Sequence, residues 1–276
     1  MKTQNYLLVL TTLVVTACQT RNTIEKNEIT YATINEEKSY SLLNSPDNPK
    51  YELKLSFTYP ETCKDEKILE KIRCLFLSSF FDNTYENYTP EEAVAQYIEN
   101  KQHDYKALED EFRKEMKNPD KGSLIRFFYH EMISNEVTFD ENRLISFSVN
   151  TENYTGGAHP AHTLSNYVID LRRGTFITES ELFVDDFKNK MAQILVKRLA
   201  AQNELDDPKQ LEQTGFFDIG KIAPNGNFLI DGSGVTYSFN EYEIAAYAVG
   251  TIHVHVPYDE IKNLLRKGNP IRHVVK

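Results

Sequence analysis

Residues 123–157 read SLIRFFYHEMISNEVTFDENRLISFSVNTENYTGG, and this stretch decides the fold class. Two long runs alternate apolar and polar side chains, with Asp140-Glu141-Asn142 between them. Alternation with a period of two is typical of a half-buried strand, and a short polar turn joins two such strands into an antiparallel hairpin. The stretch therefore predicts an antiparallel sheet with one face covered by other elements.

The segments before this hairpin supply more strands and two helices. Residues 29–59 show strand-like alternation that is interrupted by the turn sequence NSPDNP. Residues 65–81 place apolar side chains on one helical stripe, which predicts an amphipathic helix. Residues 89–116 predict a second helix that starts with Thr89 as N-cap and Pro90 in its first turn.

The segments after the hairpin repeat this organisation. Residues 162–178 predict a hairpin with Arg172-Arg173-Gly174 at its tip, and residues 179–203 predict a helix. A further hairpin is expected over 226–239, then a strand over 251–256 and a short helix after Pro257. We therefore expect an α+β fold of two lobes, 29–155 and 156–276, with antiparallel sheets and helices packed on one face.

The N-terminus predicts export and lipid anchoring. Lys2 precedes the apolar run YLLVLTTLVV, which is too short to cross a bilayer, so residues 1–17 are expected to be a signal peptide. Small residues then precede Cys18, as in bacterial lipoproteins, so we expect Cys18 to carry acyl chains such as palmitate and residues 18–28 to form a tether. The alternative is an ordinary signal peptide whose cleavage site lies near a cysteine. The expected location is the bacterial cell envelope, on the periplasmic or exterior side, and at the outer membrane in a Gram-negative cell.

Charge and motifs narrow the function classes. The chain has 31 Lys+Arg, 41 Asp+Glu and a net charge of −10, which argues against nucleic-acid binding and favours a basic partner. No phosphate-binding loop, dinucleotide fingerprint, G-x-S-x-G elbow or H-E-x-x-H motif occurs, so we expect no cofactor.

The sequence NYTGGAHPAH, residues 153–162, allows two interpretations. In the first, Gly156 and Gly157 form a tight corner that is stiffened by Pro160. In the second, His159 and His162 meet His253 and His255 in a metal site of a hydrolase. The last two histidines share one face of their strand, because side chains two residues apart point the same way.

The two cysteines outside the N-terminal region leave another alternative open. Cys63 and Cys74 would lie too far apart for a disulfide if both were on one helix. A bridge therefore requires Cys63 to lie in the loop before the helix and to fold back. Otherwise both remain free thiols.

The signatures YTGGAH, from Tyr154 to His159, and YEIAAYAVG, from Tyr242 to Gly250, resemble the DUF3298 domain at the C-terminus of the anti-sigma factor RsiV. Residues 29–154 resemble the DUF4163 domain that precedes the catalytic domain of the deacetylase PdaC. The resemblance implies peptidoglycan or a wall-acting protein such as lysozyme as partner. It also implies a set of contact residues: Tyr154, Gly156, Gly157, His159, Tyr242 and Tyr247.

Taken together, these observations predict a lipid-anchored envelope protein that acts as a non-catalytic recognition module. The alternative is a metal-dependent hydrolase or a peptidoglycan or polysaccharide deacetylase that uses His159. The deacetylase motif of the PdaC catalytic domain is not found in this sequence: TFDEN at Thr138 lacks its glycine and its paired histidines.

Overall fold

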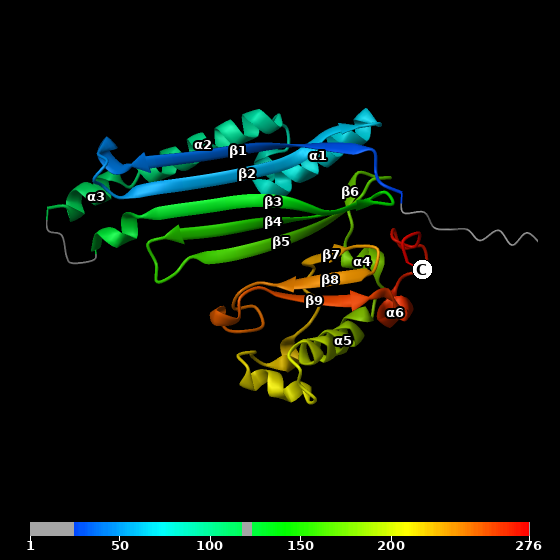
Figure 1. The fold of residues 1–276 in the computed structure, drawn as a ribbon. Helices are drawn as coiled ribbons and strands as arrows, with labels where there is room; N and C mark the ends of the chain where they lie inside the picture. Colours follow the sequence, from blue (N-terminus) through cyan, green and yellow to red (C-terminus); the bar gives the residue numbers. More distant parts are fainter. Residues whose placement is uncertain (1–24, 118–122, 276) are drawn as a thin grey trace, which may run out of the picture.

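The computed structural model describes residues 25–117 and 123–275, and it contains two sheets that pack together (Figure 1). The first sheet has six strands in sequence order, and the second has three. The strands of the first sheet are β1 (Ile29–Ser41), β2 (Lys50–Cys63), β3 (Tyr129–Glu141), β4 (Leu144–Thr155), β5 (Ala161–Asp170) and β6 (Thr175–Phe176). Those of the second sheet are β7 (Phe228–Ile230), β8 (Gly234–Phe239) and β9 (Ile252–Pro257). The α+β class predicted from the sequence is confirmed.

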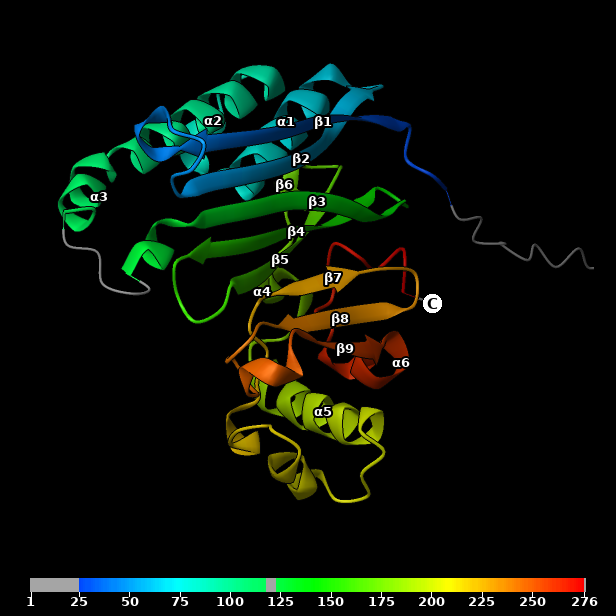
Figure 2. The ribbon, with the colours of Figure 1, turned by 60° about the vertical axis from the view of Figure 1, so that its left-hand side comes forward.

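Helices α1 (Glu66–Phe80) and α2 (Pro90–Lys106) lie on one face of the first sheet (Figures 1 and 2). In β2, Leu53, Leu55 and Phe57 are buried, whereas the residues between them are less buried, so the strand turns its apolar side to the helices. The rings of Phe76 in α1 and Phe147 in β4 stack with their centroids 4.1 Å apart. The opposite face of β2 and β3 carries polar side chains.

Both predicted helices begin at a capping side chain, and the cap predicted at Thr89 is confirmed. The Asp65 carboxylate accepts hydrogen bonds from the amides of Lys67 and Ile68 at the start of α1. Thr89 and Glu92 form a reciprocal capping box at the start of α2, with Pro90 in the first turn.

The prediction of one helix over 89–116 was wrong in its length. The helix breaks after Lys106, and α3 (Glu109–Glu115) follows. The break allows Tyr105, from α2, and Phe112, from α3, to join one small core with Phe127.

The predicted helix over 179–203 is likewise divided, into α4 (Glu179–Leu182) and α5 (Phe187–Gln202). Between them Phe183 forms a β-bridge with Leu265, and the Val184 amide donates to the Leu264 carbonyl. These bonds to the C-terminal segment, which follows α6 (Tyr258–Ile261), replace the helical hydrogen bonds. Helix α5 then supplies Met191 and Leu195 to the core of the second sheet.

Two predictions about the sheets need correction. Strands β2 and β3 pair in parallel, because residues 64–128 cross over the helical face before the chain re-enters the sheet. Strand β5 pairs with β4 from Leu144 and Asp170 to Asn153 and Ala161, so residues 161–176 belong to the first sheet. The division between the sheets therefore follows β6 and does not lie at residues 155 and 156.

Side-chain amides join the second sheet to the outer edge of β5. Asn240 Oδ1 accepts the Leu164 amide at 2.8 Å, and Asn227 Nδ2 donates to the Leu164 carbonyl at 2.9 Å. Asn227 Oδ1 accepts the Asn166 amide at 2.8 Å. These bonds satisfy backbone groups that a neighbouring strand would otherwise pair with, and they fix the position of β7 and β8.

Two sequence-based predictions concern the ends and the cysteines. Cys18 and the predicted signal peptide lie outside the described residues. No helix in the described part has the length and apolar character needed to cross a bilayer. Cys63 ends β2 and Cys74 lies in the third turn of α1, and both are free thiols in the structure.

Candidate functional site

The loop of residues 156–160 joins β4 to β5 and forms a tight corner at one end of the first sheet. Gly156 has φ +80, and a β-carbon there would overlap the backbone of Arg126. Gly157 has no such neighbour and no left-handed conformation. The Tyr154 hydroxyl donates to the Gly157 carbonyl at 3.0 Å and closes the loop. The corner therefore requires the first glycine and tolerates a side chain at the second.

His159 lies beside two tyrosines from a distant segment. Its ring centroid is 3.9 Å from that of Tyr247 and 6.4 Å from that of Tyr242. His159 Nδ1 lies 2.9 Å from the Pro160 carbonyl, and Nε2 lies 3.4 Å from the Tyr242 hydroxyl. Because a carbonyl only accepts, Nδ1 carries the hydrogen, and Nε2 of the neutral ring accepts from Tyr242. The Tyr247 hydroxyl also donates to the Pro160 carbonyl, at 3.1 Å.

Tyr242 is held in a conformation that tyrosine rarely adopts. Its φ is +63, in the left-handed region, and 58% of its surface is exposed. The turn around it is fixed by the Asn240 amide, which donates to the Glu243 carboxylate at 2.8 Å. Such strain persists where the surrounding structure imposes it, and it is concentrated at functional sites. Here it presents an aromatic ring to solvent beside His159.

Alternating histidines and carboxylates continue from this ring cluster across the sheet. His162 Nδ1 lies 2.9 Å from Glu241 Oε1, and its Nε2 lies 3.5 Å from Glu152 Oε2. The other oxygen of Glu152 lies 2.8 Å from His130 Nε2. The chain of contacts thus joins β3, β4, β5 and the segment after β8.

We use the name corner cluster for eight residues that share this surface: His130, Glu152, Tyr154, His159, His162, Glu241, Tyr242 and Tyr247. The sequence singled out all but three of them. Glu152 could have been found, because it lies two residues before Tyr154 on the same face of β4. His130 and Glu241 come close only through the strand register and the position of the second sheet, and no local signal marks them.

A concave pocket opens next to the corner cluster on the open face of the first sheet. It has a volume of about 310 Å³. The Tyr154 ring stacks on His130 at 5.5 Å and forms one wall. Phe128 and Tyr129 contribute apolar surface, and the remaining lining residues are Lys50 and Glu52. The pocket and the exposed rings together form one surface that combines aromatic faces, carboxylates and a lysine.

The electrostatics around Tyr247 favour its neutral phenol. At Tyr247, partial burial and then the Glu241 carboxylate raise the pKa of the phenol. The ring therefore acts as a hydrogen-bond donor and a stacking surface, not as a base. In the described residues the corner cluster thus offers stacking faces and charged acceptors.

The alternative with four histidines is not realised. His253 Nδ1 lies 2.9 Å from Ser238 Oγ, and His255 Nδ1 lies 3.0 Å from Thr236 Oγ1. Both rings therefore face β8 and not the corner. Within residues 25–117 and 123–275, no three His, Cys, Asp or Glu side chains are grouped so that they could hold a metal ion.

Two family models match separate parts of the chain. Residues 180–259 match the family described as a protein of unknown function, DUF3298, and residues 45–162 match the family described as deacetylase PdaC. The predicted resemblance to DUF3298 and to PdaC is confirmed, while the assignment to DUF4163 stays a prediction. Both matches fit a protein associated with the cell envelope. No curated protein matches the chain.

Two solved structures share the fold. A member of the DUF3298 family from Bacteroides fragilis has 26% sequence identity and a TM-score of 0.86, covering 91% of this chain and 99% of that one. A DUF3298 family protein from Pseudomonas aeruginosa has 13% identity and a TM-score of 0.58, covering 87% of this chain and 96% of that one. The chain is thus an α+β protein with the fold of a DUF3298 family member.

Proposed function

We propose that the protein is a lipid-anchored recognition module of the bacterial cell envelope that binds the glycan strands of peptidoglycan without cleaving them. The observation that carries the proposal is the corner cluster, where Tyr242, Tyr247 and His159 present rings beside the carboxylates of Glu152 and Glu241. Aromatic faces pack against the apolar faces of sugar rings, and carboxylates accept hydrogen bonds from hydroxyl and amide groups.

The shape of the surface favours a glycan over a flat protein partner. The pocket of about 310 Å³ beside His130 and Tyr154 is concave, and it is continuous with the exposed ring of Tyr242 through the corner cluster. One sugar would occupy the pocket, and the next would stack on the rings. The predicted anchor at Cys18 would keep this surface close to the wall.

Two alternatives remain as outcomes of the test. A basic wall-acting protein such as lysozyme would be attracted by the net charge of −10. A metal-dependent deacetylase at His159 receives no support from the geometry. In the described residues no metal-ligand group forms there, and the His159 nitrogens already contact Pro160 and Tyr242.

The test is a binding measurement with purified peptidoglycan sacculi and with triacetylchitotriose. We expect the protein to be retained by sacculi and to bind the oligosaccharide saturably. Replacement of Tyr242 by alanine should weaken binding by about tenfold, equivalent to about 1.4 kcal/mol. Tyr88→Ala is the matched control, since Tyr88 is also an exposed tyrosine but lies between α1 and α2.

Several results would overturn the proposal. The first is no retention by either glycan. The second is equal binding by wild type and the Tyr242→Ala variant. The third is retention only by lysozyme, lost at high salt, which would assign the surface to a protein partner. Release of acetate from the oligosaccharide would make the protein an enzyme.

A further inference from the structure

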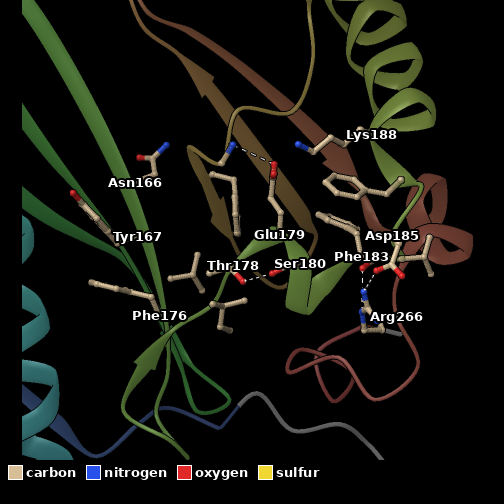
Figure 3. A pocket seen from close by; sticks show the side chains of 16 residues that line it. Asn166, Tyr167, Phe176, Thr178, Glu179, Ser180, Phe183, Asp185, Lys188 and Arg266 are labelled. Carbon is tan, nitrogen blue, oxygen red and sulfur yellow. Dashed lines mark hydrogen bonds and ion pairs between the residues drawn. The ribbon is translucent and has the colours of Figure 1, made fainter.

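A second cavity lies between the β5–β6 edge of the first sheet and helices α4 and α5 (Figure 3). Its volume is about 590 Å³, and it contains no residue of the corner cluster. Figure 3 shows Tyr167 and Phe176 on one wall and Phe183 on the opposite wall. Phe187 and Phe228 complete a lining of five aromatic rings. A cavity of this size with an aromatic lining is typical of a small-molecule site.

Charged groups reach into this aromatic space. Figure 3 shows Glu179 and Lys188 extending toward the same region from α4 and α5. One oxygen of Glu179 accepts the Gly226 amide at 3.2 Å. In the described part of the chain, neither Glu179 nor Lys188 has an ion-pair partner within 4.0 Å. The other two charges of the lining, Asp185 and Arg266, pair with each other.

A buried phenol lies near Glu179. It belongs to Tyr237, whose side chain is 0% exposed. Burial and then the Glu179 carboxylate raise the pKa of the Tyr237 phenol, so this neighbour is uncharged. Asn166, another residue of the cavity wall, donates to Ser238 Oγ and leaves its buried amide oxygen without a partner among the described residues. The cavity wall thus offers the Glu179 carboxylate and the Asn166 amide oxygen as acceptors and the Lys188 ammonium as a donor.

From this arrangement we infer that the cavity binds a zwitterion with an apolar side chain, namely a free hydrophobic amino acid. The ammonium group of the ligand would pair with Glu179 and its carboxylate with Lys188. Its apolar side chain would lie against the phenylalanines. A ligand with both charges pairs with both protein groups, whereas a singly charged ligand pairs with only one of them.

The test is a calorimetric titration of the purified protein with four probes. Phenylalanine carries both charges, phenethylamine only the ammonium, phenylpropanoate only the carboxylate, and N-acetylglucosamine neither. We expect phenylalanine to bind, and each singly charged analogue to bind at least about tenfold more weakly. The inference does not depend on glycan binding at the corner cluster.

Four variants assign the charges. Glu179→Gln should weaken the binding of phenylalanine and phenethylamine and leave that of phenylpropanoate unchanged. Lys188→Met should weaken the binding of phenylalanine and phenylpropanoate and leave that of phenethylamine unchanged. Lys190→Met, on the same helix but outside the cavity lining, and Asp206→Asn, at an exposed loop position, should bind as the wild type does. Circular dichroism melting curves check that each variant is folded.

Three outcomes would overturn the inference. These are no saturable binding of phenylalanine by the wild type, affinity that does not change in Glu179→Gln and Lys188→Met, and preferential binding of N-acetylglucosamine at this cavity. Two results together would show that the two sites act separately. Sacculus binding would be weakened in Tyr242→Ala but not in Glu179→Gln or Lys188→Met, and phenylalanine binding would be weakened in Glu179→Gln and Lys188→Met but not in Tyr242→Ala.

Discussion

The two ends of the paired strands β4 and β5 carry acidic groups in opposite environments. At one end, Glu152 contacts His162 and His130 on a surface that solvent reaches. At the other end, Asp170 is 1% exposed and accepts hydrogen bonds from the side chains of Arg172 and Arg173. The first arrangement leaves charges available to a ligand, and the second uses them to hold a turn. The same pair of strands thus supports recognition at one end and stability at the other.

The largest expected effect is a loss of stability when the buried Asp170 is replaced. Asp170→Ala removes a buried acceptor of Arg172 and Arg173, and we expect it to lower the free energy of unfolding by about 2–3 kcal/mol. The measurement is urea denaturation. At the open end, Glu152→Ala should cost no more than about 1 kcal/mol, because exposed ion pairs contribute little. Equal losses at both positions would contradict the comparison.

The corner beside the open end depends on one of its two glycines. Gly156→Ala forces a β-carbon into the Arg126 backbone at positive φ, so we expect a loss of more than about 1 kcal/mol in unfolding free energy. Gly157→Ala is the control and should change stability by less than that. Both are measured by thermal melting. If Gly156→Ala did not lower stability, the backbone of this corner would be able to shift away from Arg126, and the comparison would be wrong.

Tyr242 gives a test in which stability and binding move in opposite directions. Tyr242→Gly removes the strain of a left-handed tyrosine, and we expect it to raise the unfolding free energy by up to about 1 kcal/mol. The same variant should lose glycan binding, because it removes the exposed ring. Denaturation and the sacculus assay are performed on the same preparation. A variant that is both destabilised and fully able to bind would contradict the assignment.

The smallest expected effect is the change in the stabilisation by Asp170 as the pH falls. Burial raises the pKa of Asp170, but hydrogen bonds from Arg172 and Arg173 outweigh it and hold that pKa below the ordinary value. The unfolded chain therefore binds a proton first as pH falls, and the stabilisation by Asp170 is complete above about pH 3.9 and is lost below it. The stability difference between wild type and Asp170→Asn should shrink in that window. Denaturation at stepwise lower pH checks it.

Local signals predicted much of the fold because the relevant forces act within a few residues. The cap at Thr89 and the alternation in β3 and β4 define their elements without the rest of the chain. The parallel pairing of β2 with β3 could not be predicted, since it depends on how residues 64–128 cross the sheet. The break between α4 and α5 had the same origin, because Phe183 bonds to the distant Leu265.

The candidate site shows the same limit. Tyr154, His159, Tyr242 and Tyr247 were singled out by the two signatures, and the structure brings the last three together. The partner of His162 was missed, because Glu241 reaches it only once the second sheet has packed on the first. The proposed metal set failed for a related reason: the strand that carries His253 and His255 turns them toward β8.

The asparagines at the outer edge of β5 have a consequence for many copies of this chain crowded on one surface. An open strand edge recruits identical strands and begins a fibril. Asn227 and Asn240 occupy the backbone groups of Leu164 and Asn166 from within the same molecule. A template for polymerisation is thereby removed at this edge, and the second sheet covers it without adding a strand to the first.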